Sequence, residues 1–135
     1  MVIVDSNIVF SSLLSADSHF LSLLLDDKNK FISPYFLFVE IFKHKEKIIK
    51  HTKISQDSLF EILDSVLSNI QFIPLNNLSL LSRTFAYNLC KDIDRKDAVF
   101  VALTIEYDGL LWTGDRKLIE ALKRKGFDKF YQPEF

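Results

Sequence analysis

The sequence predicts an α/β fold, a three-layer α/β/α domain with a short, mostly parallel central sheet. The chain opens on Val2, Ile3 and Val4, a mostly β-branched apolar run that is typical of a strand buried on both faces. Similar short apolar runs alternate with longer segments of helical periodicity. The 135 residues are 48% hydrophobic and include only three glycines, which favours one packed domain over residues 1–135 and argues against disorder.

The first half of the chain contains two predicted strands and three predicted helices. Ser6 and Asn7 are favoured helix caps, so a helix is expected from there to Leu14. Further elements are a helix over Ser18 to Asp26, a turn over Asp27 to Lys30, a strand over Phe31 to Ser33 and a helix over Pro34 to His51. Pro34 suits the first turn of that helix, which is apolar as far as Phe42 and strongly basic after it.

The second half continues the alternation. Ser55 opens a helix with apolar residues at helical spacing, at Leu59, Ile62, Leu63, Val66 and Leu67. Then come a strand over Phe72 to Pro74, a helix over Leu78 to Cys90, a charged connection over Lys91 to Lys96, a helix over Ala98 to Glu106, a strand over Leu110 to Thr113, a helix ending at Lys125 and Gly126, and a last strand over Phe127 to Tyr131. Strands that alternate with helices imply right-handed crossovers and a parallel sheet.

Composition excludes several classes of protein. A single cysteine rules out an internal disulfide, so a reducing compartment, the cytoplasm, is expected. No signal peptide is recognisable, and the longest apolar run, Pro34 to Phe42, is too short to span a membrane. No Gly-x-Ser-x-Gly elbow or phosphate-binding glycine loop is present, which disfavours serine hydrolases and nucleoside-triphosphate chemistry. The net charge of −1 neither favours nor excludes a polyanionic partner.

Four carboxylates stand in unusual places. Asp5 ends the first strand, and Asp115 follows the strand over Leu110 to Thr113 through Gly114. Asp97 begins an apolar helix, and Glu40 is the only charged residue between Tyr35 and Phe42. Ligands of parallel α/β proteins bind beyond the carboxyl ends of the strands, so these side chains are expected to meet there.

Carboxylates brought together repel one another, and a divalent cation would relieve that repulsion. Oxygen ligands suit Mg²⁺ or Mn²⁺, while the absence of nearby histidine or cysteine disfavours zinc. A metal pair held by carboxylates is a common arrangement for hydrolysing a phosphodiester, where one ion activates water and the other stabilises the leaving oxygen.

A purely structural role is the alternative for each acid. Asp5, Asp97 and Asp115 each precede a helix, where aspartate is a favoured cap, and Asp94 and Asp97 could form a capping pair. Glu40 could pair with Lys43 or His44 one turn along its helix.

Four blocks of sequence carry a resemblance to a known family. They are Val2 to Asn7, Glu40 within its helix, Lys96 to Leu103, and Trp112 to Leu118. In this order and spacing the chain resembles a PIN domain, and within that family the small VapC-like toxin ribonucleases. The segment from Ser55 to Cys90 matches no motif of use.

The resemblance implies a metal site formed by Asp5, Glu40, Asp97 and Asp115, which would also be the catalytic residues. Asn7 and Thr113 match polar positions that support the site in the family, and Asp94 matches an accessory acidic position. It also implies a Mg²⁺- or Mn²⁺-dependent endoribonuclease with an RNA substrate, a homodimer, and an antitoxin partner in a toxin-antitoxin pair.

Basic residues near these acids are candidates for RNA contact. Lys43, Lys47 and Lys50 share a helix face with the spacing four and three, on the helix that bears Glu40. Arg116 lies beside Asp115 and could touch a phosphate, although all four could equally be solvated surface charges.

Two other functions compete with the ribonuclease. A non-catalytic PIN-like module would bind RNA or protein without a metal requirement. A phosphatase of the aspartyl-phosphate type also begins with a strand and an aspartate, but it needs a second aspartate two residues on, where this chain has Asn7.

Overall fold

A four-stranded parallel sheet forms the middle of the molecule, and this confirms the predicted fold class. The computed structural model describes residues 1–15 and 19–133. The strands are β1 (Val2–Val4), β2 (Phe31–Pro34), β3 (Ile70–Ile73) and β4 (Leu110–Trp112), and their order in the sheet is β3-β2-β1-β4. Every neighbouring pair is parallel.

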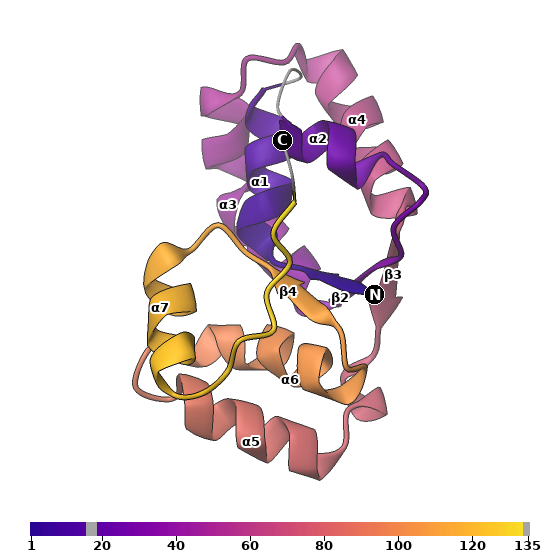
Figure 1. Ribbon diagram of the computed structural model, residues 1–135. Helices are drawn as coiled ribbons and strands as arrows, with labels where there is room; N and C mark the ends of the chain where they lie inside the picture. Colours follow the sequence, from indigo (N-terminus) through magenta and orange to yellow (C-terminus); the bar gives the residue numbers. More distant parts are fainter. Residues whose placement is uncertain (16–18, 134–135) are drawn as a thin grey trace.

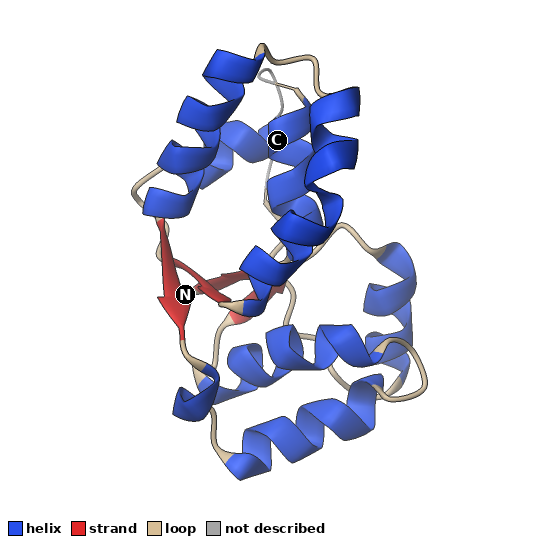
Figure 2. Ribbon diagram, turned by 180° about the vertical axis from the view of Figure 1, so that it is seen from behind, coloured by secondary structure: helices blue, strands red, loops and turns tan. Residues whose placement is uncertain are grey.

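Helices cover both faces of this sheet (Figure 1). One face carries α1 (Ser6–Leu14), α2 (His19–Leu24), α3 (Phe36–His51) and α4 (Gln56–Ser68). The other carries α5 (Leu80–Cys90), α6 (Ala98–Glu106) and α7 (Arg116–Arg124). Figure 2 shows the same three layers from behind, with the sheet between the two groups of helices. No helix among the described residues is long and apolar enough to cross a membrane.

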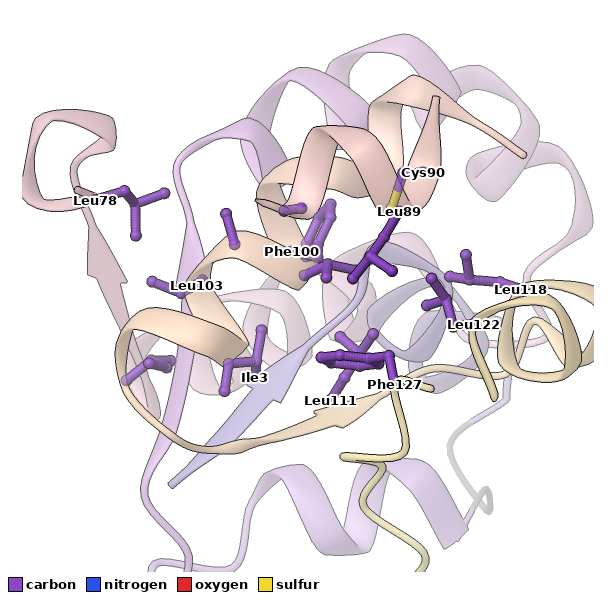
Figure 3. Packing of buried hydrophobic residues seen from close by; sticks show 14 of the residues in the cluster. Ile3, Leu78, Leu89, Cys90, Phe100, Leu103, Leu111, Leu118, Leu122 and Phe127 are labelled. Atoms are coloured by element: carbon purple, nitrogen blue, oxygen red, sulfur yellow. The ribbon is translucent and has the colours of Figure 1, made fainter. Parts of the chain in front are cut away.

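Each strand supplies side chains to both layers, because successive side chains point to opposite faces of a sheet. Val2 and Val4 pack against α1 to α4, whereas Ile3 between them packs against α5 to α7. In the same way, Trp112 enters the first core and Leu111 the second. Figure 3 shows Ile3 and Leu111 lying among side chains of α5, α6 and α7. A β1 buried on both faces is what its apolar run predicts.

Cys90 belongs to the core beside α6 and is fully buried. Burial, followed by the negative charge of Asp97, raises the pKa of its thiol to about 12. The thiol is therefore neutral and packs as a small apolar side chain, as the sequence predicts.

The order in which successive strands are added to the sheet reverses at β1, between β1 and β4. The chain moves outward from β1 through β2 to β3, and then returns across the second face to add β4 on the other side of β1. At such a reversal the connections leave on opposite faces, which opens a crevice at the carboxyl ends of the two strands. Asp5 follows β1 and Thr113 follows β4 at this point.

Some predicted boundaries are wrong. Pro34 is the last residue of β2, paired with Ile73, and α3 begins only at Phe36. A residue that follows three strand residues can complete the strand without donating a hydrogen bond, so its ring does not require a helix. Strand β3 begins at Ile70 instead of Phe72. Ser18, the expected start of the second helix, lies outside the described residues.

Two other expectations also need correction. Helix α5 starts at Leu80, capped by Ser79, because the 3₁₀ turn η1 (Leu75–Asn77) occupies the preceding residues. Phe127 to Tyr131 is not a strand and makes one bridge, between Phe130 and Leu111. Backbone hydrogen bonds to Leu111 and Leu122 hold the segment, and Phe127 and Phe130 pack against the α5–α7 core.

Candidate active site

Asp5 lies at the carboxyl end of β1 and is the best-buried carboxylate described here, with 6% of its surface exposed. The strand ends there because Asp5 caps α1, its Oδ1 accepting a hydrogen bond from the Ser6 amide at 2.7 Å. The other carboxylate oxygen, Oδ2, faces Thr113 and Asn7.

Thr113 and Asn7 fix the orientation of Asp5. The Thr113 hydroxyl donates to Asp5 Oδ2 at 2.7 Å and accepts from Asn7 Nδ2 at 3.2 Å. Asn7 Nδ2 also donates to Asp5 Oδ2 at 3.1 Å, while its Oδ1 accepts from the Gly114 amide at 3.0 Å. This network joins the end of β1 to the residues that follow β4.

Asp115 follows Thr113 through an exposed Gly114 and caps α7. Its Oδ1 accepts from the Leu118 amide at 3.2 Å, and its own amide donates to the Thr113 hydroxyl at 3.2 Å. The Asp115 side chain is exposed beside the buried Asp5.

Glu40 reaches the same region from the second turn of α3. Its side chain is only 14% exposed, and its Oε2 lies 3.6 Å from Nε2 of His44. His44 therefore meets the expected alternative of a partner one turn along the helix, and the expectation that no histidine lies near the four acids is wrong.

Asp97 is half-buried at the end of the 3₁₀ turn η2 (Arg95–Asp97), immediately before α6. Burial raises the pKa of its carboxyl to about 7, and the negative charges of Asp5, Asp94, Asp115 and Glu40 add to this effect. Asp94 is exposed and caps η2 by accepting from the Lys96 amide at 3.0 Å.

Asp5 is subject to the same repulsion. Burial raises the pKa of its carboxyl, the hydrogen bonds from Thr113 and Ser6 oppose the rise, and the charges of Asp115 and Glu40 add to it. The negative charges of Asp115 and Glu40 thus disfavour the ionised forms of both Asp5 and Asp97, and these four residues are called the acidic cluster below.

The capping alternative holds for some of these residues. Asp5 and Asp115 do cap helices, and Asp94 caps a 3₁₀ turn. Asp97 makes no side-chain capping bond, so it does not complete the expected capping pair with Asp94. Capping thus accounts for the positions of Asp5 and Asp115, and the contact with His44 provides a structural role for Glu40, whereas the half-buried Asp97 has neither.

The donor set of the acidic cluster fits a hard divalent cation, because it consists of carboxylate oxygens whose charges are not neutralised by lysine or arginine in the described ion pairs. In the conformation described, no three acidic, histidine or cysteine side chains among residues 1–15 and 19–133 are close enough to hold one ion. The acidic cluster therefore suits a divalent cation by the chemistry and charge of its oxygen donors and not by their positions in this conformation.

The predicted RNA-contact residues lie on two helices. Lys43, Lys47 and Lys50 are exposed on α3 beyond Glu40, and Arg116 is exposed at the start of α7 beside Asp115. All four are absent from the ion pairs described.

Sequence reasoning missed two features of this region. The Gly114 amide holds Asn7, a contact that residue types alone do not indicate. His44 and His51 line one hollow together with Phe10, although no ligand spacing was evident for the histidines. Their separation of seven residues, two helical turns, is the signal that could have indicated a shared face.

Comparison with known protein families agrees with the geometry. The model of a family described as PIN domain matches residues 3–131, a stretch that includes β2, β3, β4, all of β1 except Val2, and the acidic cluster. No curated protein matches the chain.

Proposed function

The chain belongs to the PIN domain family, whose members are typically nucleases, and from this premise we propose that it is a metal-dependent endoribonuclease. The observation that carries the proposal is the acidic cluster at the reversal between β1 and β4. The negative charges of Asp115 and Glu40 add to burial in raising the pKa of Asp5 and of Asp97, an arrangement that costs stability in a protein that does not bind a cation there.

Asp5, Glu40, Asp97 and Asp115 would hold one or two Mg²⁺ or Mn²⁺ ions. When bound, such ions supply charge neutralisation of the phosphodiester and activation of water for its hydrolysis. Thr113 and Asn7 would hold Asp5 in one orientation, since both donate to its Oδ2. Asp94 would add negative charge beside Asp97 without joining the buried network.

Surface charge supports RNA as the substrate. Lys43, Lys47 and Lys50 extend from the acidic cluster along α3, and Arg116 stands on the opposite side at α7. Cationic side chains that flank the cluster would bind phosphates on either side of the scissile bond. In the cell we propose a cytoplasmic homodimer acting as the toxin of a toxin-antitoxin pair, with an antitoxin protein as its partner.

Thermal unfolding with EDTA, Mg²⁺ or Mn²⁺ tests the metal site directly. A ligand that binds only the folded state stabilises it by about 2.7 kcal/mol at a hundredfold excess over its dissociation constant. Asp5→Asn should abolish this effect and RNA cleavage. The protein should stay folded, because the amide oxygen can still accept from Ser6, but it should be less stable, since the amide nitrogen cannot accept from Thr113 and Asn7 as Oδ2 does. Asp57→Asn, at an exposed position in the first turn of α4, is the matched control and should keep both the stabilisation by metal and the cleavage of RNA.

Full cleavage of RNA by Asp5→Asn would contradict the assignment of the cluster. RNA binding without any metal effect or cleavage would instead favour the non-catalytic binding module. Phosphorylation of Asp5 by a phosphoryl donor would favour the phosphatase.

A further inference from the structure

A hollow of about 430 Å³ lies between α1 and α3, outside the acidic cluster. It is lined by Phe10, Leu14, His44, Lys47, Ile48 and His51. Its volume is within the range of ligand-binding pockets, roughly 300–1,000 Å³. Ile48 forms the buried floor, whereas Lys47 and His51 are exposed at the margin.

The walls of this hollow combine flat rings with one lysine, Lys47. The ring centroids of Phe10 and His44 are 5.4 Å apart, and the ring planes meet at 65°. The two rings therefore pack edge to face against each other, and a planar ligand can stack on a ring face that this contact leaves open. Unpaired bases of RNA are bound in this way, by stacking on aromatic side chains and by polar contacts to their edges.

His44 connects the hollow to the acidic cluster. It lines the hollow, and its Nε2 lies 3.6 Å from Glu40 Oε2. A nucleotide seated in the hollow would thus lie next to the site of the proposed cleavage. Lys47 at the margin supplies a positive charge for the backbone that leads into the cluster.

We infer that this hollow binds one unpaired base of a single-stranded RNA whose adjoining phosphate lies at the acidic cluster. The inference rests on the proposed function and adds to it a base-binding site formed by residues of α1 and α3. Duplex RNA does not fit, since its bases are stacked within the helix and cannot enter a hollow between two protein helices.

The test measures binding in EDTA, so that cleavage cannot consume the ligand. The full chain is titrated with an oligouridylate and with an abasic ribose-phosphate oligomer of equal length and charge. We expect the base-bearing oligomer to bind about 5- to 150-fold more tightly, the range that corresponds to one stacked base.

Two variants locate the stacked base. Phe10→Leu keeps an apolar side chain without the ring, and His51→Ala removes an exposed ring at the end of α3. Both should lower the ratio of the two affinities towards one. Lys50→Ala is the matched control, because Lys50 lies on the same helix and does not line the hollow. Lys50→Ala should weaken the binding of both oligomers equally and leave the ratio of the two affinities unchanged.

Photocrosslinking with a single 4-thiouridine gives a second readout, and we expect crosslinked peptides that contain Phe10, His44 or His51. Crosslinks elsewhere, or a ratio that both variants leave unchanged, would overturn the base site and leave the ribonuclease proposal intact. Crosslinking in the hollow without Mn²⁺-dependent cleavage would support the base site and overturn the ribonuclease. Failure to bind either oligomer in EDTA would overturn the base site, and the ribonuclease proposal would then be tested by Mn²⁺-dependent cleavage alone.

Discussion

The hydroxyl of Thr113 donates to Oδ2 of Asp5 at 2.7 Å, although the two residues are 108 positions apart in the chain. Asp5 follows β1 and Thr113 follows β4, so this hydrogen bond connects the carboxyl ends of two neighbouring strands at the point where the strand order reverses. The same hydroxyl accepts from Asn7 and from the Asp115 amide. One small side chain therefore links three of the polar residues proposed for the active site.

Replacing Thr113 by valine keeps the shape of the side chain and removes this hydroxyl. We expect the free energy of unfolding to fall by about 1–3 kcal/mol, because a buried carboxylate loses a donor. The pKa of Asp5 should rise further, since the Thr113 hydrogen bond lowers it in the wild type. Denaturant unfolding, followed by the fluorescence of the single tryptophan, Trp112, measures the change in stability.

Thr104→Val is the matched control for this variant. Thr104 is equally buried, but its hydroxyl donates to the Phe100 carbonyl within α6, away from the cluster. This variant should retain stabilisation by Mn²⁺, whereas Thr113→Val should lose much of it. Equal Mn²⁺ responses in the two variants would show that the Thr113 hydroxyl has no part in the metal site.

The metal-free protein should become more stable as the pH falls from about 7 to about 4. The pKa of Asp97 is about 7 in the folded protein against an ordinary value of 3.8. Between these values the folded state binds a proton that the unfolded state does not bind, so stability rises as the pH falls. Thermal unfolding in EDTA across this range measures the slope.

Asp97→Asn separates this effect from other titrations. The variant cannot bind the extra proton, so its stability should depend less steeply on pH over the same range. Saturating Mn²⁺ should also reduce or reverse the slope in the wild type, because a cation favours the ionised carboxylates. A variant whose pH profile matches the wild type would mean that Asp97 is not the group that titrates.

The sequence predicts most of the fold because local signals and burial agree in this chain. The β-branched run of β1 and the nearly all-apolar α6 have few alternatives to a buried strand and a buried helix. Boundaries failed where a residue suits two structures, as Pro34 does at the end of a strand or the start of a helix. The sequence cannot indicate the single bridge at Phe130, which depends on tertiary packing of its ring.

Less of the candidate site than of the fold could be predicted from the sequence. Strand ends and parallel topology bring Asp5 and Asp115 to one edge, and those positions follow from the sequence. The hydrogen bonds of Thr113 were not predictable from its residue type, because they depend on the register of β1 against β4. The hollow between α1 and α3 depends on how two helices pack, which periodicity alone does not determine.

Gly109 should not tolerate a side chain. A Cβ at this position would lie 2.8 Å from the Met1 carbonyl oxygen and 2.6 Å from Ile3 Cδ1, where β4 approaches β1. Gly109→Ala should therefore reduce the free energy of unfolding by about 1–3 kcal/mol, the usual cost of overpacking. Chemical denaturation of the purified variant measures this change.

Gly114→Ala provides the comparison, because its Cβ would meet nothing closer than Asn7 Oδ1 at 3.6 Å. That separation is ordinary van der Waals contact, so this variant should remain close to the wild type in stability. A similar loss at both positions would show that glycine flexibility, and not the close approach of β4 to β1, explains Gly109.

Ser6 lies next to Asp5, and its buried hydroxyl has no hydrogen-bond partner among the described residues. Ser6→Ala should leave the free energy of unfolding unchanged or raise it by up to about 1 kcal/mol, since no bond is lost and alanine favours the helix. Ser33→Ala is the matched control, because its equally buried hydroxyl donates to the Val4 carbonyl at 3.0 Å. That variant should lose about 0.5–1.5 kcal/mol. Urea unfolding of both variants, first with EDTA and then with Mn²⁺, measures the two changes in stability. A loss of stability in Ser6→Ala that appears only with Mn²⁺ would mean that the Ser6 hydroxyl contributes to the metal site beside Asp5. A loss in EDTA equal to that of Ser33→Ala would contradict the prediction.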